Sequence, residues 1–135
     1  MFITRESDYA VRIIRELADG TRKTVESIST KERVPIPFAY KILKKLEKGG
    51  LVQSFRGAGG GYRLAREAAG ITLFDVMSAI DGKLLLSECM DHSYRCPYRE
   101  GGKQCKVHGE FERIQALILA GLKERTLDQI FSGNP

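Results

Sequence analysis

A glycine-rich run at residues 57–61 most restricts how this 135-residue chain can fold. The flanking stretches, Leu51–Phe55 and Tyr62–Leu64, are short and rich in apolar side chains, which is typical of strands. The run therefore predicts the turn of a β-hairpin. It does not indicate a nucleotide-binding loop, because residues 62–66 look like a strand rather than a helix and no Gly-Lys-Ser/Thr follows.

Three helices are predicted before this hairpin. The first covers residues 6–19 and ends at Gly20, because its apolar side chains fall on one helical face: Tyr9, Ala10, Ile13, Ile14, Leu17 and Ala18. Thr24 looks like the N-cap of a second helix over about residues 25–32. A third helix has Pro37 in its first turn and ends at Gly49-Gly50. A hairpin directly after a helix-turn-helix indicates a winged helix.

The second half of the chain predicts two further helices and a long loop between them. Thr72 to Asp75 has the form of a capping box that opens a helix over about residues 73–80. Residues 81–104 show no periodicity and predict a loop, after which a long helix covers about residues 106–124. Thr126 to Gln129 forms a second capping box before a final short helix. The expected fold class is mainly α with a small β-hairpin wing.

We expect three regions along the chain. Residues 1–66 form the winged helix-turn-helix DNA-binding region. Residues 67–104 form a connecting helix and a cysteine-rich loop, and residues 105–135 form a dimerisation helix and the C-terminal helix.

The segment Ala116–Leu122 is apolar on all sides of its helix, so every side needs a cover. A partner subunit is the natural cover in a chain of this size, which predicts a homodimer; the alternative is a central core helix. The segment is far too short to span a membrane, and we expect no membrane partner. The acidic residues near the start of the chain do not fit a signal peptide, which predicts a cytoplasmic protein.

Positive charge is concentrated in the first half of the chain. Residues 1–66 hold 14 Lys and Arg against 7 Asp and Glu, whereas residues 67–135 hold 8 against 10. This excess of positive charge in the first half indicates a polyanionic binding partner, with nucleic acid as the first candidate and a membrane surface as the second. On the third helix Lys41, Lys44, Lys45 and Lys48 recur at helical spacing opposite its apolar face, as a recognition helix requires. The alternative is a solvated lysine-rich face.

The predicted wing carries arginines on both sides of its turn. Arg56 precedes the glycine run, and Arg63 and Arg66 follow it. An arginine at a wing tip can enter the narrow minor groove of DNA, and the glycines let the loop approach the backbone closely.

All three cysteines and both histidines of the chain lie within 20 residues. Their order is Cys89, His92, Cys96, Cys105 and His108, and this density indicates a soft metal or an iron–sulfur cluster. Zinc is the main competitor, because three cysteines and one histidine form an accepted structural zinc set. A redox sensor that uses the thiols alone is the third option. No nucleophile–base set or carboxylate pair appears, so we do not expect an enzyme.

The chain closely resembles the Rrf-two family of bacterial transcription regulators over nearly all of its length. The motifs that carry the resemblance are Asp8-Tyr9-Ala10-Val11, Leu51-Val52, Arg56-Gly57-Ala58-Gly59-Gly60-Gly61-Tyr62, Asp75-Val76, Ala79-Ile80-Asp81-Gly82 and the cysteine loop that ends Cys105-Lys106-Val107-His108. The resemblance implies a homodimer with two winged heads joined by crossed long helices. It also implies an iron–sulfur cluster held by Cys89, Cys96 and Cys105.

The family divides over the fourth cluster ligand. Some members use the histidine that matches His108 and carry a 2Fe–2S cluster, whereas others use an acid that matches Asp8, donated by the partner subunit, and carry a 4Fe–4S cluster. This chain has both residues, and its long cysteine loop slightly favours Asp8 and 4Fe–4S, with zinc as the alternative metal.

The resulting prediction is a dimeric regulator that binds a roughly palindromic site in double-stranded DNA and senses iron, oxygen, nitric oxide or cluster status. We expect the following residues to contact DNA: Pro37, Tyr40, Lys41, Lys44, Lys45, Lys48, Arg56, Gly59, Gly60 and Arg63. Tyr40 and Lys41 depart from the acid and the amide found at these positions in some family members, so the operator sequence does not carry over. The alternatives are a zinc or thiol-redox regulator of the same fold and an iron–sulfur redox protein that does not bind DNA.

Overall fold

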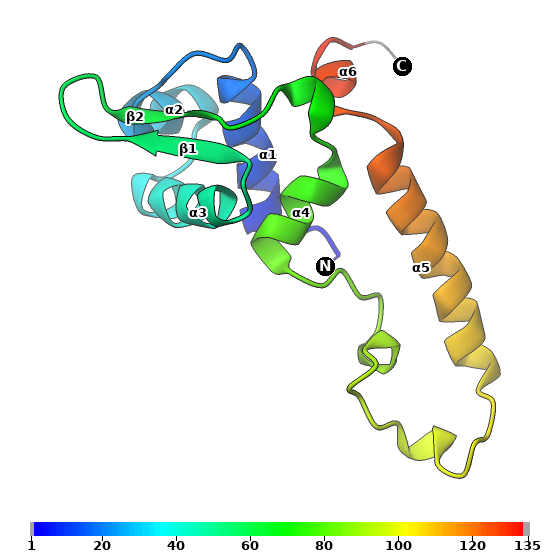
Figure 1. The fold of residues 1–135 in the computed structure, drawn as a ribbon. Helices are drawn as coiled ribbons and strands as arrows, with labels where there is room; N and C mark the ends of the chain where they lie inside the picture. Colours follow the sequence, from blue (N-terminus) through cyan, green and yellow to red (C-terminus); the bar gives the residue numbers. More distant parts are fainter. Residues whose placement is uncertain (1, 134–135) are drawn as a thin grey trace.

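The computed structural model describes residues 2–133 and is mainly helical, with one two-stranded antiparallel hairpin (Figure 1). Its elements are α1 (Arg5–Leu17), α2 (Val25–Glu32), α3 (Ile36–Lys48), β1 (Val52–Phe55), β2 (Gly61–Leu64), η1 (Ala68–Gly70), α4 (Leu73–Asp81), η2 (Glu88–Met90), η3 (Pro97–Arg99), α5 (Lys106–Glu124) and α6 (Leu127–Phe131). The predicted fold class, a winged helix followed by a long C-terminal helix, is confirmed.

The boundaries differ slightly from those predicted. α1 begins at Arg5, because Thr4 is the N-cap and accepts a hydrogen bond from the Ser7 backbone N–H. It ends at Leu17, and Ala18 is its C-cap. The loop over residues 81–104 contains two single-turn helices, η2 and η3. A single turn is too short to leave a periodic pattern, so these two helices are not predictable from apolar spacing.

The core of the molecule lies where α1, α2, α3 and the hairpin meet. Its largest fully buried side chains include those of Ile13, Ile14, Leu17, Ile42 and Leu46. The two strands pair from Val52 with Leu64 to Phe55 with Gly61. Burying each such aliphatic side chain stabilises the fold by about 1.5–3 kcal/mol, so this face of α3 is firmly fixed on the domain.

The same core extends beyond residue 66. Ile71, Val76, Ile80 and Leu127 belong to one buried cluster with α1 and α3. Leu127 donates its backbone N–H to the Ile71 carbonyl at 2.7 Å, which docks α6 beside η1. We call residues 2–81 together with 126–133 the head.

Residues 82–125 leave the head and return to it, and we call them the arm (Figure 1). None of the residues of α5 is fully buried, and the side chain of Leu117 is 61% exposed. Leu86 donates its backbone N–H to Gln115 Oε1 at 2.7 Å, which ties the outgoing segment to α5. Within residues 2–133, no helix is long and apolar enough to cross a membrane.

Candidate nucleic-acid interface and cysteine site

A groove of about 640 Å³ lies between α3, the start of α2 and the wing. Tyr40 and Lys44 line it from α3, and Arg56, Gly59 and Gly60 line it from the wing. Five of the ten residues predicted to contact DNA therefore share one concave surface. They come from two elements far apart in the sequence, as a helix and a wing on one duplex require.

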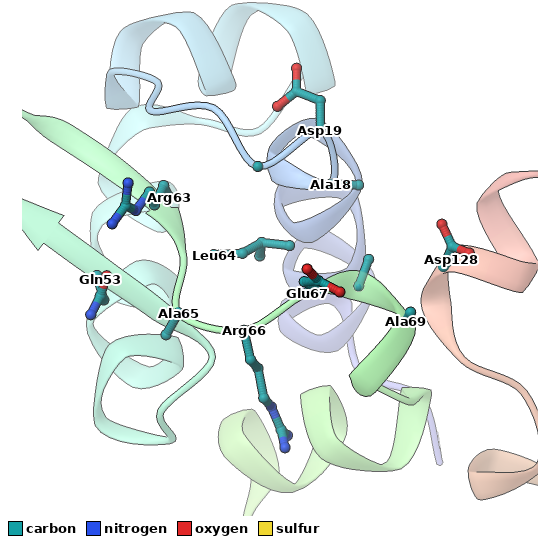
Figure 2. Close-up of a pocket in the computed structure, with 12 residues that line it drawn as sticks. Ala18, Asp19, Gln53, Arg63, Leu64, Ala65, Arg66, Glu67, Ala69 and Asp128 are labelled. Atoms are coloured by element: carbon teal, nitrogen blue, oxygen red, sulfur yellow. The ribbon is translucent and has the colours of Figure 1, made fainter.

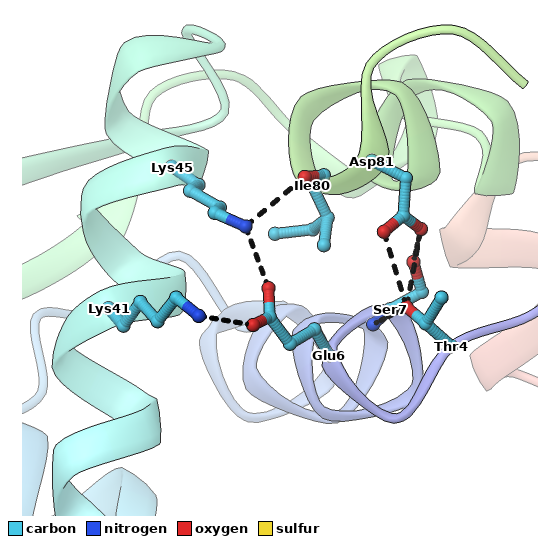
Figure 3. A network of polar contacts seen from close by, with 7 residues as sticks. All are labelled: Thr4, Glu6, Ser7, Lys41, Lys45, Ile80 and Asp81. Carbon is cyan, nitrogen blue, oxygen red and sulfur yellow. Dashed lines mark hydrogen bonds and ion pairs between the residues drawn. The ribbon is translucent and has the colours of Figure 1, made fainter.

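The four lysines of α3 do not form a single free stripe. Lys41 and Lys45 form ion pairs with Glu6 of α1, at 2.6 and 2.7 Å, as Figure 3 shows. Hydrogen bonds from Lys41 and then from Lys45 hold the pKa of Glu6 below its ordinary value. Lys44 and Lys48 are exposed, so they are the lysines of α3 available to phosphates without breaking an ion pair with Glu6.

The same region joins α4 to α1 and α3. Lys45 Nζ lies 3.4 Å from the Ile80 carbonyl oxygen. Ser7 and Thr4 donate hydrogen bonds to the Asp81 carboxylate (Figure 3). Asp81 ends α4, so these contacts sit where the arm leaves the head.

Arg63 lies on the opposite face of the hairpin from the groove. Its guanidinium lies 5.1 Å from the centroid of the Phe55 ring, and it lines a cleft of about 520 Å³ between the hairpin, α1 and α6. Figure 2 shows this cleft, with Arg63 and Gln53 on the hairpin and Asp128 on α6. Arg66, the other predicted wing arginine, lies 3.6 Å from the carboxylate of Asp75.

Arg22, in the loop between α1 and α2, contacts the wing, although no pattern in the sequence predicts it. It precedes α2, yet its guanidinium lies 4.1 Å from the Phe55 ring centroid and donates a hydrogen bond to the Gly59 carbonyl. The hydrogen bond joins positions 37 residues apart, and only the fold reveals both contacts.

The cysteine loop folds its three thiols toward one cavity of about 380 Å³. Cys89, Cys96 and Cys105 line it together with His108, and all three cysteines are free and half-buried. The remaining lining comes from Tyr98, Arg99, Val107 and Phe111. Candidate ligands from η2 and from the N-caps of η3 and α5 are thus gathered at the end of the arm.

His108 lies between the thiols and a carboxylate. Its Nδ1 is 3.4 Å from Cys89 Sγ, and its backbone N–H donates to Cys105 Sγ at 3.5 Å. Its Nε2 is 3.1 Å from Glu112 Oε1 and 3.2 Å from Arg99 Nη1. A metal-binding histidine commonly directs one ring nitrogen to the metal and the other to a carboxylate; here Nδ1 faces the Cys89 thiol and Nε2 faces the Glu112 carboxylate.

The other candidate ligands lie elsewhere. The Asp8 carboxylate is 49% exposed on α1, where it pairs with Arg12 at 2.9 Å. His92 lines a neighbouring cavity with Cys89 and His108. Within residues 2–133, no three Cys, His, Asp or Glu side chains are already close enough to hold a single metal ion.

A helix-turn-helix, a glycine-rich wing and a groove between them that Lys44 and Arg56 line define a winged-helix DNA-binding protein. The chain belongs to the Rrf2 (Rrf-two) family, described as "Iron-dependent Transcriptional regulator", whose sequence profile matches residues 3–133. It is a transcription regulator of this family and not an enzyme. The similar proteins with a described role are also transcription regulators.

Similar proteins include the HTH-type transcriptional regulator IscR of Vibrio atlanticus, which is 30% identical over 99% of this chain and 77% of its own length. Among solved structures, CymR (YrzC), the global cysteine regulator of B. subtilis, is 25% identical with a TM-score of 0.74, over 98% of both chains. IscR of T. potens has the same fold, with a TM-score of 0.76 at 23% identity over 98% of this chain and 88% of its own.

Proposed function

We propose that the chain is a dimeric regulator whose affinity for a roughly palindromic DNA site is set by an iron–sulfur cluster on Cys89, Cys96 and Cys105. The observation that carries this proposal is the shared cavity at the end of the arm, which three half-buried thiols line together with His108. Cysteines without a common role would have no reason to meet there.

The donor set suits a cluster. Thiolates are the ordinary ligands of iron–sulfur clusters, and an imidazole replaces a thiolate in some of them. A bound cluster would supply a centre that responds to iron supply, oxygen or nitric oxide. A group of several metal atoms needs a wider cavity than one ion, and this agrees with thiols that share a cavity without forming a site for a single metal ion.

We further propose His108 as the fourth ligand from the same chain, with Asp8 of the partner subunit as the competing ligand. The contacts of His108 with Cys89 and Glu112 support His108. Asp8 has its own partner in Arg12. The choice also bears on the cluster type, because the resemblance connects histidine with 2Fe–2S and the acid with 4Fe–4S.

On the DNA side, Tyr40 and Lys44 would lie along the major groove while Arg56 reaches the minor groove from the wing. The basis is the common groove that these residues line. Lys44 is exposed and suited to a phosphate contact, and the tyrosine presents an aromatic face to base edges.

The dimer would form through the exposed face of α5. Ala116, Leu117, Ala120 and Gly121 are exposed there, and they are apolar or small. A second copy of this helix would cover them, which is the usual reason for such a face on a long helix.

The decisive experiment joins a visible spectrum with a DNA-binding assay. Protein purified without oxygen should be brown and contain iron and acid-labile sulfide, and Cys89→Ser, Cys96→Ser and Cys105→Ser should each remove most of the colour. The wild type should retain a DNA duplex selected from a random pool, with a different affinity after cluster loss. A colourless protein with one zinc per chain would refute the cluster, and failure to retain any duplex would refute DNA binding.

A thiol-redox regulator is the second candidate, because the three thiols are free and share one cavity. The similar CymR of B. subtilis is described as a global cysteine regulator, so regulation connected with sulfur occurs among the chain's structural relatives. In this case colourless protein would change its DNA affinity on mild oxidation, and a thiol reductant would restore it.

A further inference from the structure

The loop between α1 and α2 forms a base beneath the wing. Lys23 and Tyr62 exchange two backbone hydrogen bonds of 2.8 Å, so the loop adds a short bridge beside β2. The approach is close: a Cβ on Gly61 would lie 2.4 Å from the Lys23 carbonyl oxygen. The wing is therefore anchored to this loop by its backbone.

The loop itself is held firmly. Lys23 Nζ donates to the Glu16 carbonyl at 2.6 Å and lies 3.0 Å from Asp19 Oδ2. The Thr21 backbone N–H and the Lys23 ammonium lower the pKa of Asp19 to about 2, so this carboxylate stays charged at neutral pH. The backbone that carries the Arg22 side chain is therefore held in place by these contacts.

From this base the Arg22 side chain extends to the wing turn. It covers the Phe55 ring, which ends β1, and it donates to the carbonyl of Gly59 within the turn. Glycines at positive φ, such as Gly57 and Gly59, leave a turn with many accessible conformations. The hydrogen bond from Arg22 to the turn and its packing over the Phe55 ring reduce this conformational freedom. Arg56, which must reach DNA, lies between these two contact points.

We propose that Arg22 is a positioning residue that fixes the wing turn in the shape that presents Arg56 to DNA. The inference rests on the DNA binding of the proposed function and adds the residue that determines how well the wing fits. Arg22 acts through the turn, because its guanidinium is engaged by the Gly59 carbonyl and the Phe55 ring.

The test compares Arg22→Ala and Arg22→Lys with a matched control, Lys31→Ala, which removes one exposed positive charge from α2. Each variant is titrated over a range of salt concentrations with a duplex selected by the wild type. Arg22→Ala should weaken binding roughly tenfold. Arg22→Lys should recover part of the loss, because lysine can still donate to the Gly59 carbonyl and cover the ring. Lys31→Ala should bind nearly as the wild type does.

Two readouts separate positioning from a direct phosphate contact. A lost phosphate contact lowers the salt slope by about one, whereas loss of positioning leaves the slope unchanged. In a double-mutant cycle, Arg22→Ala should cost little once Arg56→Ala is present, because the arginine that it positions has gone. Amide exchange at residues 57–61 should be faster in Arg22→Ala, while exchange in α1 stays the same.

Three results would overturn the inference: a salt slope lowered by one, effects of Arg22→Ala and Arg56→Ala that add, or unchanged exchange in the wing. If the wild type binds duplexes and Arg22→Ala binds equally well, only the inference fails. If the wild type binds none, DNA binding in the proposed function fails, and the role of Arg22 on DNA fails with it.

Discussion

The Ser7 hydroxyl donates a hydrogen bond of 2.5 Å to Asp81 Oδ2 and so joins α1 to the last residue before the arm. Ser7 is 1% exposed and sits within the head, whereas Asp81 is exposed at its edge. Glu6, the residue before Ser7, forms ion pairs with Lys41 and Lys45 of α3. A change in the arm thus has a short path of polar contacts to the helix that faces the groove.

Asp81→Asn should lower the free energy of unfolding by about 1 kcal/mol, the usual net value of such a hydrogen bond. It should also reduce the difference in DNA affinity between protein with and without the proposed cluster. Urea unfolding and DNA titrations measure the two effects, with the exposed Glu124→Gln as the control. An unchanged affinity difference would show that the signal takes another route.

Acidification should destabilise the head through Glu6. Its pKa is lowered by hydrogen bonds from Lys41 and Lys45, so the charged form stabilises the fold. This contribution is complete above the ordinary value of 4.5 and is lost as the pH falls through the lower folded value. Urea unfolding between pH 6 and 3, as approximate limits, should therefore show a smaller pH dependence for Glu6→Gln than for the wild type.

Glu6→Gln should also free two lysines for DNA. Without a carboxylate partner, Lys41 and Lys45 can reach phosphates, so affinity for duplexes of any sequence should rise and its salt dependence should steepen by about one to two. The control is Glu124→Gln, at an exposed acid at the end of α5 and outside the groove. Weaker binding at every salt concentration would mean that Glu6 mainly orients α3.

Gly61→Ala should damage the wing far more than Gly57→Ala. Both glycines have positive φ, but only Gly61 faces a backbone oxygen, that of Lys23, where a Cβ would collide. Gly57→Ala should cost about 1 kcal/mol for the unfavourable backbone alone, and Gly61→Ala should cost more. Thermal unfolding and DNA titration measure both; equal losses would contradict the anchoring of the wing on Lys23.

His108→Ala should reduce cluster retention, because its contact with Cys89 and Cys105 places it in the thiol cavity. Glu112→Gln should have a smaller effect in the same direction by loosening the orientation of the imidazole. Asp8→Ala is the comparison variant. If it releases the cluster and abolishes the holo–apo difference while His108→Ala is silent, the ligand comes from the partner subunit.

Leu117→Glu should convert the proposed dimer to monomers, because a charge at the centre of the exposed apolar face of α5 would be buried between copies. Light scattering after size exclusion measures the mass. Lys106→Glu, an exposed charge reversal at the start of the same helix, is the control. A monomeric wild type at micromolar concentration would contradict the dimer itself.

Local signals predicted most of the elements. The capping boxes at Thr72–Asp75 and Thr126–Gln129 form as expected, because both partners lie within one turn. The hairpin followed from its glycines and flanking apolar residues. The contacts that shape the site join distant positions, such as Glu6 with Lys41 or Arg22 with Phe55, and no spacing rule shows them. The spacing of the four lysines predicts that they share one face of α3. The ion pairs of Lys41 and Lys45 with Glu6 of α1 depend on how the two helices pack, which the spacing does not show.

The docking of α6 makes the arm a loop closed at both ends by one core. Leu127 takes its place beside Ile71 only after the whole arm has been synthesised, so a growing chain carries an incomplete head until α6 emerges. The conformational entropy that the arm loses when its two ends are joined is therefore lost during folding. Both ends of the arm are therefore attached to one core, at Asp81 through Ser7 and at Leu127 through Ile71, so a change of shape in the cysteine loop would act on the head at these two places.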